Sequence, residues 1–172
     1  YEVKIIRGTD IMPEQIIFHR PTIDDAGWVN SILAEHPTRC CDYNFTTLYA
    51  WQTTFDTNIA AVCNCLVARY TIPDLGERYL FPLGSPQDVL SAVMLLKEHC
   101  LSAGRQLTLV CVTAQNEDFL NRHFPGIFTF KEDRNGMEYL YETESMVTMS
   151  GRHLSGKRNH MKHFIAQQHE WT

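Results

Sequence analysis

No apolar run in this 172-residue chain approaches the ~18–20 residues that a membrane-spanning helix requires. Residues 1–15 also lack the apolar segment of a signal peptide. The chain has no internal repeat and no low-complexity linker, and it starts with Tyr1 rather than methionine. We therefore expect a globular, cytoplasmic protein, trimmed from a longer chain, with one domain or one domain and an appendage.

The six cysteines show no spacing typical of a zinc site. Cys100 and Cys111 stand in apolar surroundings, which predicts small core residues. We expect no metal site, and we expect a reduced thiol at all six positions, which are Cys40, Cys41, Cys63, Cys65, Cys100 and Cys111.

The sequence also lacks a recognisable pair of nucleophile and base. The residues available for acid–base chemistry are Tyr43, His19, Glu132, Asp133 and Tyr141, and their spacing brings no two of them together. His19 lies on a predicted strand, where a structural histidine is more common than a catalytic base. The sequence therefore assigns no catalytic residue.

Charge is distributed unevenly along the chain. The sequence has 15 lysine and arginine residues against 20 aspartate and glutamate residues, a net charge of -5. Residues 151–172 contain four of the basic residues and one glutamate, a net charge of +3, which leaves -8 for residues 1–150. An acidic chain with a basic end indicates that this end binds something anionic, although a solvated helix face has the same composition.

Apolar spacing predicts a helix over residues 156–168, within the basic segment. One face carries an apolar stripe, which consists of Leu154, Met161, Phe164, Ile165 and Gln168. Lysine and arginine engage phosphates, and histidine gains positive charge in mildly acidic solution. We therefore predict that an anionic donor or an RNA contacts four residues at the edge of the stripe or facing away from it: Lys157, Arg158, His160 and Lys162.

The patterns of residues 15–141 predict strands and helices in an irregular alternation. In order, they place a strand at residues 15–21, helices at 22–35 and 45–53, strands at 58–63, 66–70 and 78–82, a helix at 86–103, a strand at 107–113, a helix at 116–123, and a hairpin of 128–131 and 137–141. Ser85 is the expected N-cap of the long helix. The nearly apolar run at 107–113 predicts a central strand that is buried on both faces.

Aromatic residues gather around the second predicted helix. Tyr43, Phe45 and Trp51, together with Arg134, form a candidate substrate pocket. Aromatic residues at helical spacing are also typical of a core, and Arg134 also suits the hydrogen bonds of a turn. Both interpretations stay open.

This order of elements resembles the GNAT acyltransferase fold, an α/β (α+β) architecture with a mixed central sheet flanked by helices. The resemblance implies that the strands at 78–82 and 107–113 splay apart to admit an acyl donor. A coenzyme-A enzyme of this fold holds the pyrophosphate on backbone N–H groups of the loop at residues 83–88. Pro86 has no N–H, and the carboxylate of Asp88 repels phosphate, so we expect no coenzyme A as a cofactor.

Four segments narrow the resemblance to one family. They are residues 43–51 (YNFTTLYAW), 81–84 (FPLG), 132–134 (EDR) with 139–141 (YLY), and 154–160 (LSGKRNH) followed by Phe164. They resemble the bacterial family of uncharacterised proteins grouped with the C-terminal domain of phosphatidylglycerol lysyltransferase. Members of this family carry two GNAT-like halves joined by a basic helix, and this chain is similar to the first half and the joining helix.

The resemblance and the change of charge at residues 142–155 divide the chain into a GNAT-like domain, 1–145, and a basic linker helix, 146–172, without the family's second half. The resemblance implies transfer of an aminoacyl or acyl group, with aminoacyl-tRNA as a candidate donor. We expect this chain to be inactive alone, and to associate with the second half or with another copy of itself. Two alternatives stay open, which are a coenzyme-A-dependent N-acetyltransferase and a GNAT-like interaction module.

Overall fold

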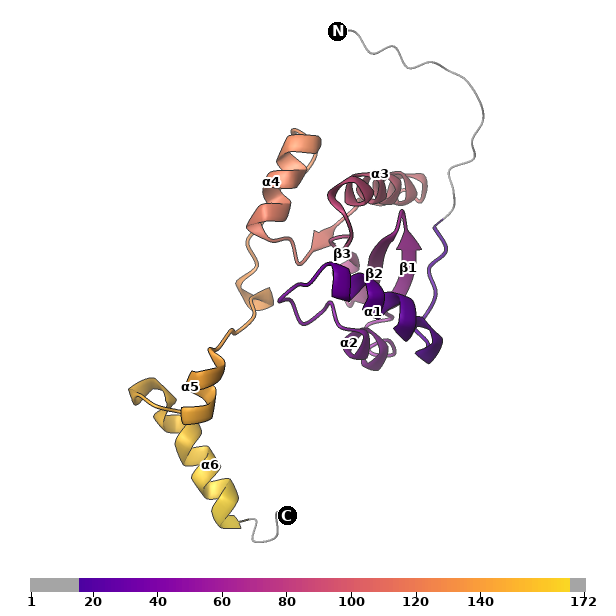
Figure 1. Ribbon diagram of the computed structural model, residues 1–172. Helices are drawn as coiled ribbons and strands as arrows, with labels where there is room; N and C mark the ends of the chain where they lie inside the picture. The colour runs from indigo at the N-terminus through magenta and orange to yellow at the C-terminus, as the bar shows by residue number, and fades with distance from the viewer. Residues whose placement is uncertain (1–15, 168–172) are drawn as a thin grey trace, which may run out of the picture. The chain divides into compact units, whose positions relative to one another are not determined.

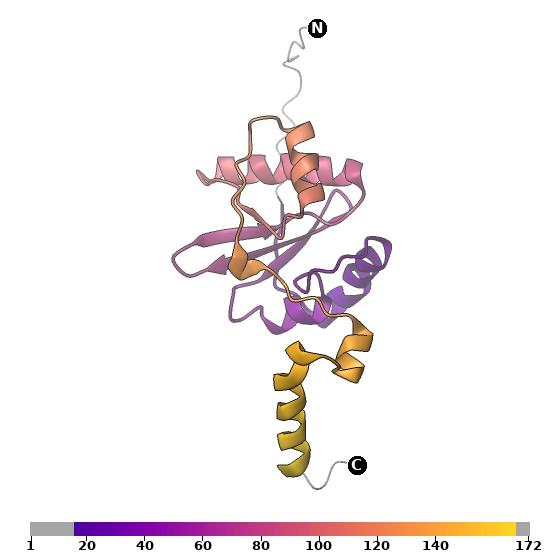
Figure 2. The same cartoon turned by 90° about the vertical axis from the view of Figure 1, so that its left-hand side faces the viewer.

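The computed structural model describes residues 16–167 of the chain, which divides into two compact units, Tyr1–Gly136 and Met137–Thr172. The first unit contains a four-stranded mixed sheet with helices on both faces (Figure 1 and Figure 2). This arrangement confirms the predicted mixed α/β fold with helices flanking a central sheet. Gln15 of the predicted first strand and Gln168 of the apolar stripe lie outside the described residues.

The sheet has the strand order β1-β2-β3-β4. Strand β1 (Asn58–Val62) pairs antiparallel with β2 (Cys65–Ile72), and β2 pairs antiparallel with β3 (Gly76–Leu80). Strand β4 (Leu109–Val110) pairs parallel with β3, which makes the sheet mixed. The three predicted strands at 58–63, 66–70 and 78–82 are confirmed as β1, β2 and β3 with shifted ends.

The connection between β1 and β2 is a two-residue turn. Cys63 and Asn64 occupy it with φ of 49° and 58°, as a tight hairpin with the twist of its strands requires. Cys63, which the predicted strand at 58–63 includes, therefore lies in the turn instead. Cys65 is fully buried at the start of β2.

Side chains of the sheet alternate between two apolar layers, because successive residues of a strand point to opposite faces. On β3, Tyr79 packs with α3 (Pro86–Ser102) and α4 (Ala114–His123), while its neighbour Leu80 packs with α1 (Ala26–Glu35) and α2 (Phe45–Ala50). Both views show α3 on one side of the sheet and α1 and α2 on the other (Figure 1 and Figure 2). Burial of both faces thus stabilises the first unit.

Polar side chains cap the helices of the first unit. Asn44 accepts a hydrogen bond from the N–H of Thr46 at the start of α2, and Thr113 accepts one from Asn116 at the start of α4. Ser85 accepts the N–H of Asp88 at the start of α3, which confirms its predicted role as N-cap.

Asp25 fixes the segment that enters α1 through the 3-10 turn η1 (Ile23–Asp25). Its buried carboxylate accepts hydrogen bonds from the indole N–H of Trp28 at 2.9 Å, from the backbone N–H and hydroxyl of Thr22, and from Nε2 of His19 at 2.9 Å. Burial alone raises the pKa of Asp25, but the hydrogen bonds outweigh it and hold that pKa well below its usual range. Asp25 thus ties His19 to the segment that enters α1.

Two predicted strands, at 15–21 and 107–113, are shorter in the structure. In the described part of the first segment, residues 16–21, the one bridge to the sheet is His19 to Ile59. The run at 107–113 contributes only Leu109 and Val110 to the sheet, and it is an edge strand that is half-buried rather than a central one. Pairing stops there because Cys111 adopts a φ of 56°, outside the strand region.

The predicted hairpin of 128–131 and 137–141 does not form. The turn residues instead make the 3-10 helix η2 (Arg134–Gly136), in which the N–H of Gly136 bonds to the carbonyl of Asp133 at 3.2 Å. The two segments belong to different units. The Asn-Gly pair favours a hairpin turn, but it does not create one without strands that bury a face.

The second unit consists of α5 (Thr143–Thr148), the 3-10 turn η3 (Arg152–Leu154) and α6 (Ser155–Gln167) in its described residues. Met149 and Gly151, at φ of 47° and 88°, turn the chain between α5 and η3. The guanidinium of Arg158 donates hydrogen bonds to the carbonyls of both residues, to Gly151 at 2.8 Å. Leu154 is buried, whereas Met161 and Ile165 of the apolar stripe are 46% and 62% exposed.

Candidate functional site

A cavity of about 490 Å³ lies where β3 and β4 end. The two strands are paired at Tyr79–Leu109 and Leu80–Val110, and the N–H of Phe81 still reaches the carbonyl of Val110 at 3.1 Å. After Phe81, Leu83 forms a bridge with Leu66 of β2. The segment that follows β4 instead turns at Cys111 and leads to α4. Pairing between β3 and β4 thus ends at Phe81 and Val110, and Phe81 also lines the cavity.

Tyr43 lines this cavity as a buried hydrogen-bond donor. Its hydroxyl donates to the carbonyl of Phe81 at 2.6 Å. Burial, followed by the neighbouring Cys111 and Cys40, raises the pKa of Tyr43 above its usual range. The phenol therefore stays protonated at neutral pH, and its hydrogen bond ties Tyr43 to the end of β3.

A second cavity, of about 460 Å³, lies beside α2 and β2. Trp51 and Phe55 form part of its wall, with ring centroids 5.6 Å apart, and Tyr70 and Ile72 contribute from β2. Asp42 is the one carboxylate among its lining residues. The cavity is thus an aromatic and aliphatic hollow with a single acidic group at its wall.

The structure does not bring the four predicted pocket residues together. Trp51 lines the second cavity and Tyr43 lines the first. Phe45 stacks on Tyr49 with centroids 5.9 Å apart and belongs to the core beside α1, as the core interpretation of the aromatic segment holds. Arg134 lies in η2 and lines neither cavity.

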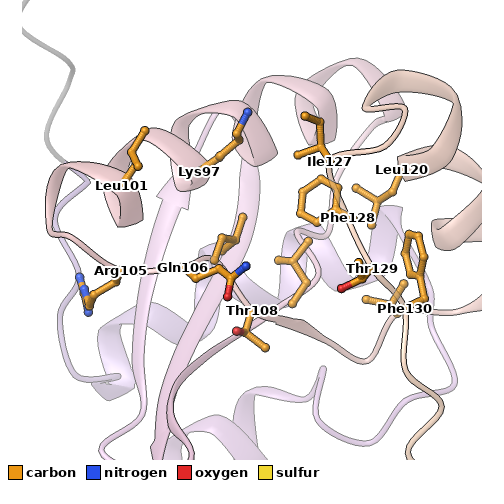
Figure 3. A pocket seen from close by; sticks show the side chains of 13 residues that line it. Lys97, Leu101, Arg105, Gln106, Thr108, Leu120, Ile127, Phe128, Thr129 and Phe130 are labelled. Atoms are coloured by element: carbon orange, nitrogen blue, oxygen red, sulfur yellow. The ribbon is translucent and has the colours of Figure 1, made fainter.

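A third cavity, of about 390 Å³, lies between α3 and the segment after α4. Figure 3 shows Lys97 and Leu101 of α3 on one side of it and Ile127 and Phe130 on the other. Arg105, at its rim, is paired with the carboxylate of Glu77. None of its lining residues is a carboxylate, a cysteine or a histidine, so the cavity has no evident acid–base group.

The loop before α3 is occupied by its own side chains. The hydroxyl of Ser85 donates to the carboxylate of Asp88 at 2.6 Å, and the amide of Asn64 reaches the same carboxylate at 3.4 Å. Gly84 packs against β2 so closely that an added Cβ would lie 2.5 Å from Sγ of Cys65. The glycine therefore permits contact with a strand, and its position does not require a ligand.

Three of the four predicted donor-binding residues are exposed on α6. They are Lys157, His160 and Lys162. The ammonium of Lys157 also lies 5.2 Å from the ring centroid of Tyr141. Arg158 is only half-exposed, because its guanidinium holds the turn at Met149 and Gly151.

One cluster has no counterpart among the sequence predictions. Cys40 and Asp42, in the loop between α1 and α2, meet Cys111 at the end of β4, and the thiol of Cys111 lies 3.2 Å from Oδ2 of Asp42. Hydrogen bonding with Cys40, burial and the carboxylate of Asp42 raise the pKa of the Cys111 thiol. Cys100 is a buried core residue as predicted, but Cys111 is a half-buried residue with polar partners.

The fold is a mixed α/β domain with a cavity at the ends of its two parallel strands. The chain belongs to the family of the phosphatidylglycerol lysyltransferase C-terminal domain, because residues 34–172 match the sequence model described as "Phosphatidylglycerol lysyltransferase, C-terminal". This match confirms the resemblance of the aromatic and basic segments.

One similar solved structure is a conserved protein of unknown function from Bacteroides thetaiotaomicron VPI-5482. It shares 25% sequence identity with a TM-score of 0.77, over 89% of this chain and 51% of that chain. The present chain thus spans about half the length of that structure. A search of curated proteins gives no significant match. Among the described residues, no helix has the length and apolar character needed to cross a membrane.

Proposed function

We propose that this chain is the non-catalytic half of a GNAT-like aminoacyl- or acyltransferase, and that α6 binds an anionic donor such as aminoacyl-tRNA. The observation that carries the proposal is the exposed charge of α6. Lys157, His160 and Lys162 are exposed, and residues 151–167 contain no aspartate or glutamate that would neutralise them. A helix with this surface attracts a phosphate backbone through counterion release, without reading its sequence.

The non-catalytic role rests on the partners of the acid–base residues. His19 is held by Asp25, and the hydroxyl of Tyr43 is held by the carbonyl of Phe81. Glu132 and Tyr141 are exposed. These bonds and positions favour structural roles, so the reacting groups would come from the second half that other members of the family contain.

The loop before α3 supports a donor other than coenzyme A. The carboxylate of Asp88 stands in the first turn of α3, where a pyrophosphate would have to bind, and like charges repel. We expect no saturable binding of acetyl-coenzyme A in a calorimetric titration. One-to-one binding with a micromolar dissociation constant would contradict this expectation and favour the N-acetyltransferase.

The donor site is best tested at Lys157 and Lys162. Arg158 is unsuitable, because its replacement would also release the carbonyls of Met149 and Gly151. Filter binding of tRNA to the wild type should weaken with salt along a log–log slope of about -2 to -3, as expected for about three phosphate contacts. The double variant Lys157→Glu/Lys162→Glu should lose binding at low salt.

A second double variant, Lys97→Glu/Lys131→Glu, is the matched control. Both lysines are exposed in the first unit, and the change in net charge is the same. The control should bind tRNA as the wild type does. If the wild type does not bind at low salt, or if both double variants lose binding equally, α6 is a structural helix and the proposal is wrong.

A further inference from the structure

The loop between α1 and α2 and the end of β4 bring together three side chains that bind metals in proteins. The thiols of Cys40 and Cys111 and a carboxylate oxygen of Asp42 all lie within 4.8 Å of one another. Two of these residues are separated by 69 positions in the sequence, so the cluster exists only in the folded chain. All three residues are half-buried, which leaves access for an ion.

The backbone positions each of the three donors. The N–H of Tyr43 bonds to the carbonyl of Cys40 at 3.2 Å, which closes the turn that carries Cys40 and Asp42. The N–H of Cys40 bonds to the hydroxyl of Thr38 at 3.3 Å. The left-handed conformation of Cys111, at a φ of 56°, redirects the chain at the end of β4. Non-glycine residues adopt this conformation rarely, and such positions concentrate at functional sites.

The spacing of the donors agrees with a tetrahedral ion. Zinc bonds of about 2.3 Å to sulfur and about 2.0 Å to oxygen place the two ligand atoms roughly 3.5 Å apart at a tetrahedral angle. The thiol of Cys111 and the carboxylate of Asp42 lie 3.2 Å apart, and the third donor is within 4.8 Å of both. Changes of a few tenths of an ångström to about 1 Å would therefore bring all three to bonding distance.

We propose that Cys40, Asp42 and Cys111 bind a divalent cation of the zinc class. Two thiolates select zinc over magnesium or calcium, which prefer oxygen ligands. Three protein ligands leave one tetrahedral position for water or a substrate atom, as in catalytic rather than structural zinc sites. This proposal differs from the expectation of no metal site, which rested on the spacing of cysteines along the chain alone.

Two of the cluster's residues line cavities described above. Cys111 lines the cavity between β3 and β4, and Asp42 lines the aromatic cavity beside α2. A bound cation would therefore lie at the boundary of the two hollows. The site is independent of α6 and does not rest on the proposed donor binding.

The test uses the full chain, stripped of metal and reduced with a phosphine. Zinc is titrated by calorimetry, and cobalt is added as a spectroscopic probe. The thiolate-to-cobalt charge-transfer band reports cysteine ligation, so it separates this site from zinc bound by the histidines of α6. We expect one zinc ion per chain at the cysteine site, with a cobalt–thiolate band.

Three variants remove one donor each. Cys111→Gly is the sharpest, because glycine adopts positive φ without strain and the fold should be retained. Cys40→Ser and Cys111→Gly should raise the zinc dissociation constant by more than the ~10–100-fold that loss of an outer-shell partner causes. Asp42→Asn should weaken binding less and keep the cobalt–thiolate band. Zinc should raise the thermal midpoint of the wild type but not that of Cys111→Gly.

Cys41→Ser is the matched control, because it changes an exposed thiol next to the cluster. It should bind zinc as the wild type does. The site is refuted if the reduced wild type takes up no zinc with a cobalt–thiolate band, or if Cys40→Ser and Cys111→Gly bind as the wild type does. A Cys40–Cys111 disulfide in the untreated protein, together with no zinc uptake after reduction, would identify a redox pair instead.

Discussion

The two units of the chain are stabilised in different ways. In the first unit, two apolar layers are buried on opposite faces of the sheet, and residues such as Ile59 and Leu96 are fully buried. In the second unit, Leu154 is the one buried residue among those described, and hydrogen bonds from Arg158 hold the turn before α6. Stability in the first unit therefore comes from apolar burial, whereas Met161 and Ile165 of the apolar stripe stay exposed in the second unit.

The largest effect should follow from a cavity in the core of the first unit. Leu96 lies on α3 with no exposed surface. Leu96→Ala removes buried methyl groups and leaves a cavity, which costs about 2–5 kcal/mol in the free energy of unfolding. Urea denaturation measures the change. A loss below about 1 kcal/mol would contradict the conclusion that tight apolar packing around α3 stabilises the first unit.

A smaller but pH-dependent effect is expected at Asp25. Asp25→Ala leaves the donors of Trp28, Thr22 and His19 without their acceptor, at a cost of about 1–3 kcal/mol. Because the pKa of Asp25 is lower in the folded than in the unfolded chain, its contribution is present above about pH 4 and is lost as pH falls further. Denaturation of the wild type from pH 6 to pH 3 should show this loss, and the variant should show a shallower decline.

A local effect is expected in the second unit. Arg158→Ala removes the hydrogen bonds to the carbonyls of Met149 and Gly151, which should lower the local opening free energy by about 1 kcal/mol. Hydrogen exchange should show faster exchange in residues 149–158 with the denaturation midpoint of the first unit unchanged. Arg158→Lys is the charge-matched control and should also exchange faster, because an ammonium lacks the planar fork of a guanidinium. Full protection in either variant would contradict the role assigned to Arg158.

The smallest effect on stability is expected at the apolar stripe. Ile165 is mostly exposed, so Ile165→Ala should change the free energy of unfolding by less than about 0.5 kcal/mol, in contrast to Leu96→Ala. Light scattering of the wild type should nevertheless show self-association that this variant weakens, because exposed apolar patches tend to find partners. A wild type that stays monomeric at every concentration would argue that the stripe needs no cover.

Local patterns predicted most elements of the first unit. Ser85, Asn44 and the apolar spacing of residues 86–103 place helix starts and faces correctly, since capping and periodicity act within a few residues. The run at 107–113 was harder, because its apolar composition does not reveal that Cys111 leaves the strand region. The hairpin predicted from Asn135-Gly136 is wrong for a related reason. A turn becomes a hairpin only where the segments on both sides of it pair as strands.

The candidate sites also differ in how much of each could be predicted from the sequence. The charge of α6 is local, so the sequence alone showed a basic helix that carries Lys157, His160 and Lys162. It did not show that Arg158 folds back onto Met149 and Gly151, because that bond depends on two left-handed residues. The cluster at Cys40 and Asp42 depends on where β4 ends, and no spacing of cysteines along the chain encodes that position.

Cys111 has a left-handed conformation, so selection for stability and selection for function should favour different residues at position 111. A side chain at such a φ costs about 1–2 kcal/mol relative to glycine. A library of all codons at this position, selected for thermal resistance alone, should therefore be enriched in glycine and asparagine. The same library selected in cells for the protein's biological role should retain cysteine if the thiol serves that role, so one codon separates the requirements of folding from those of function.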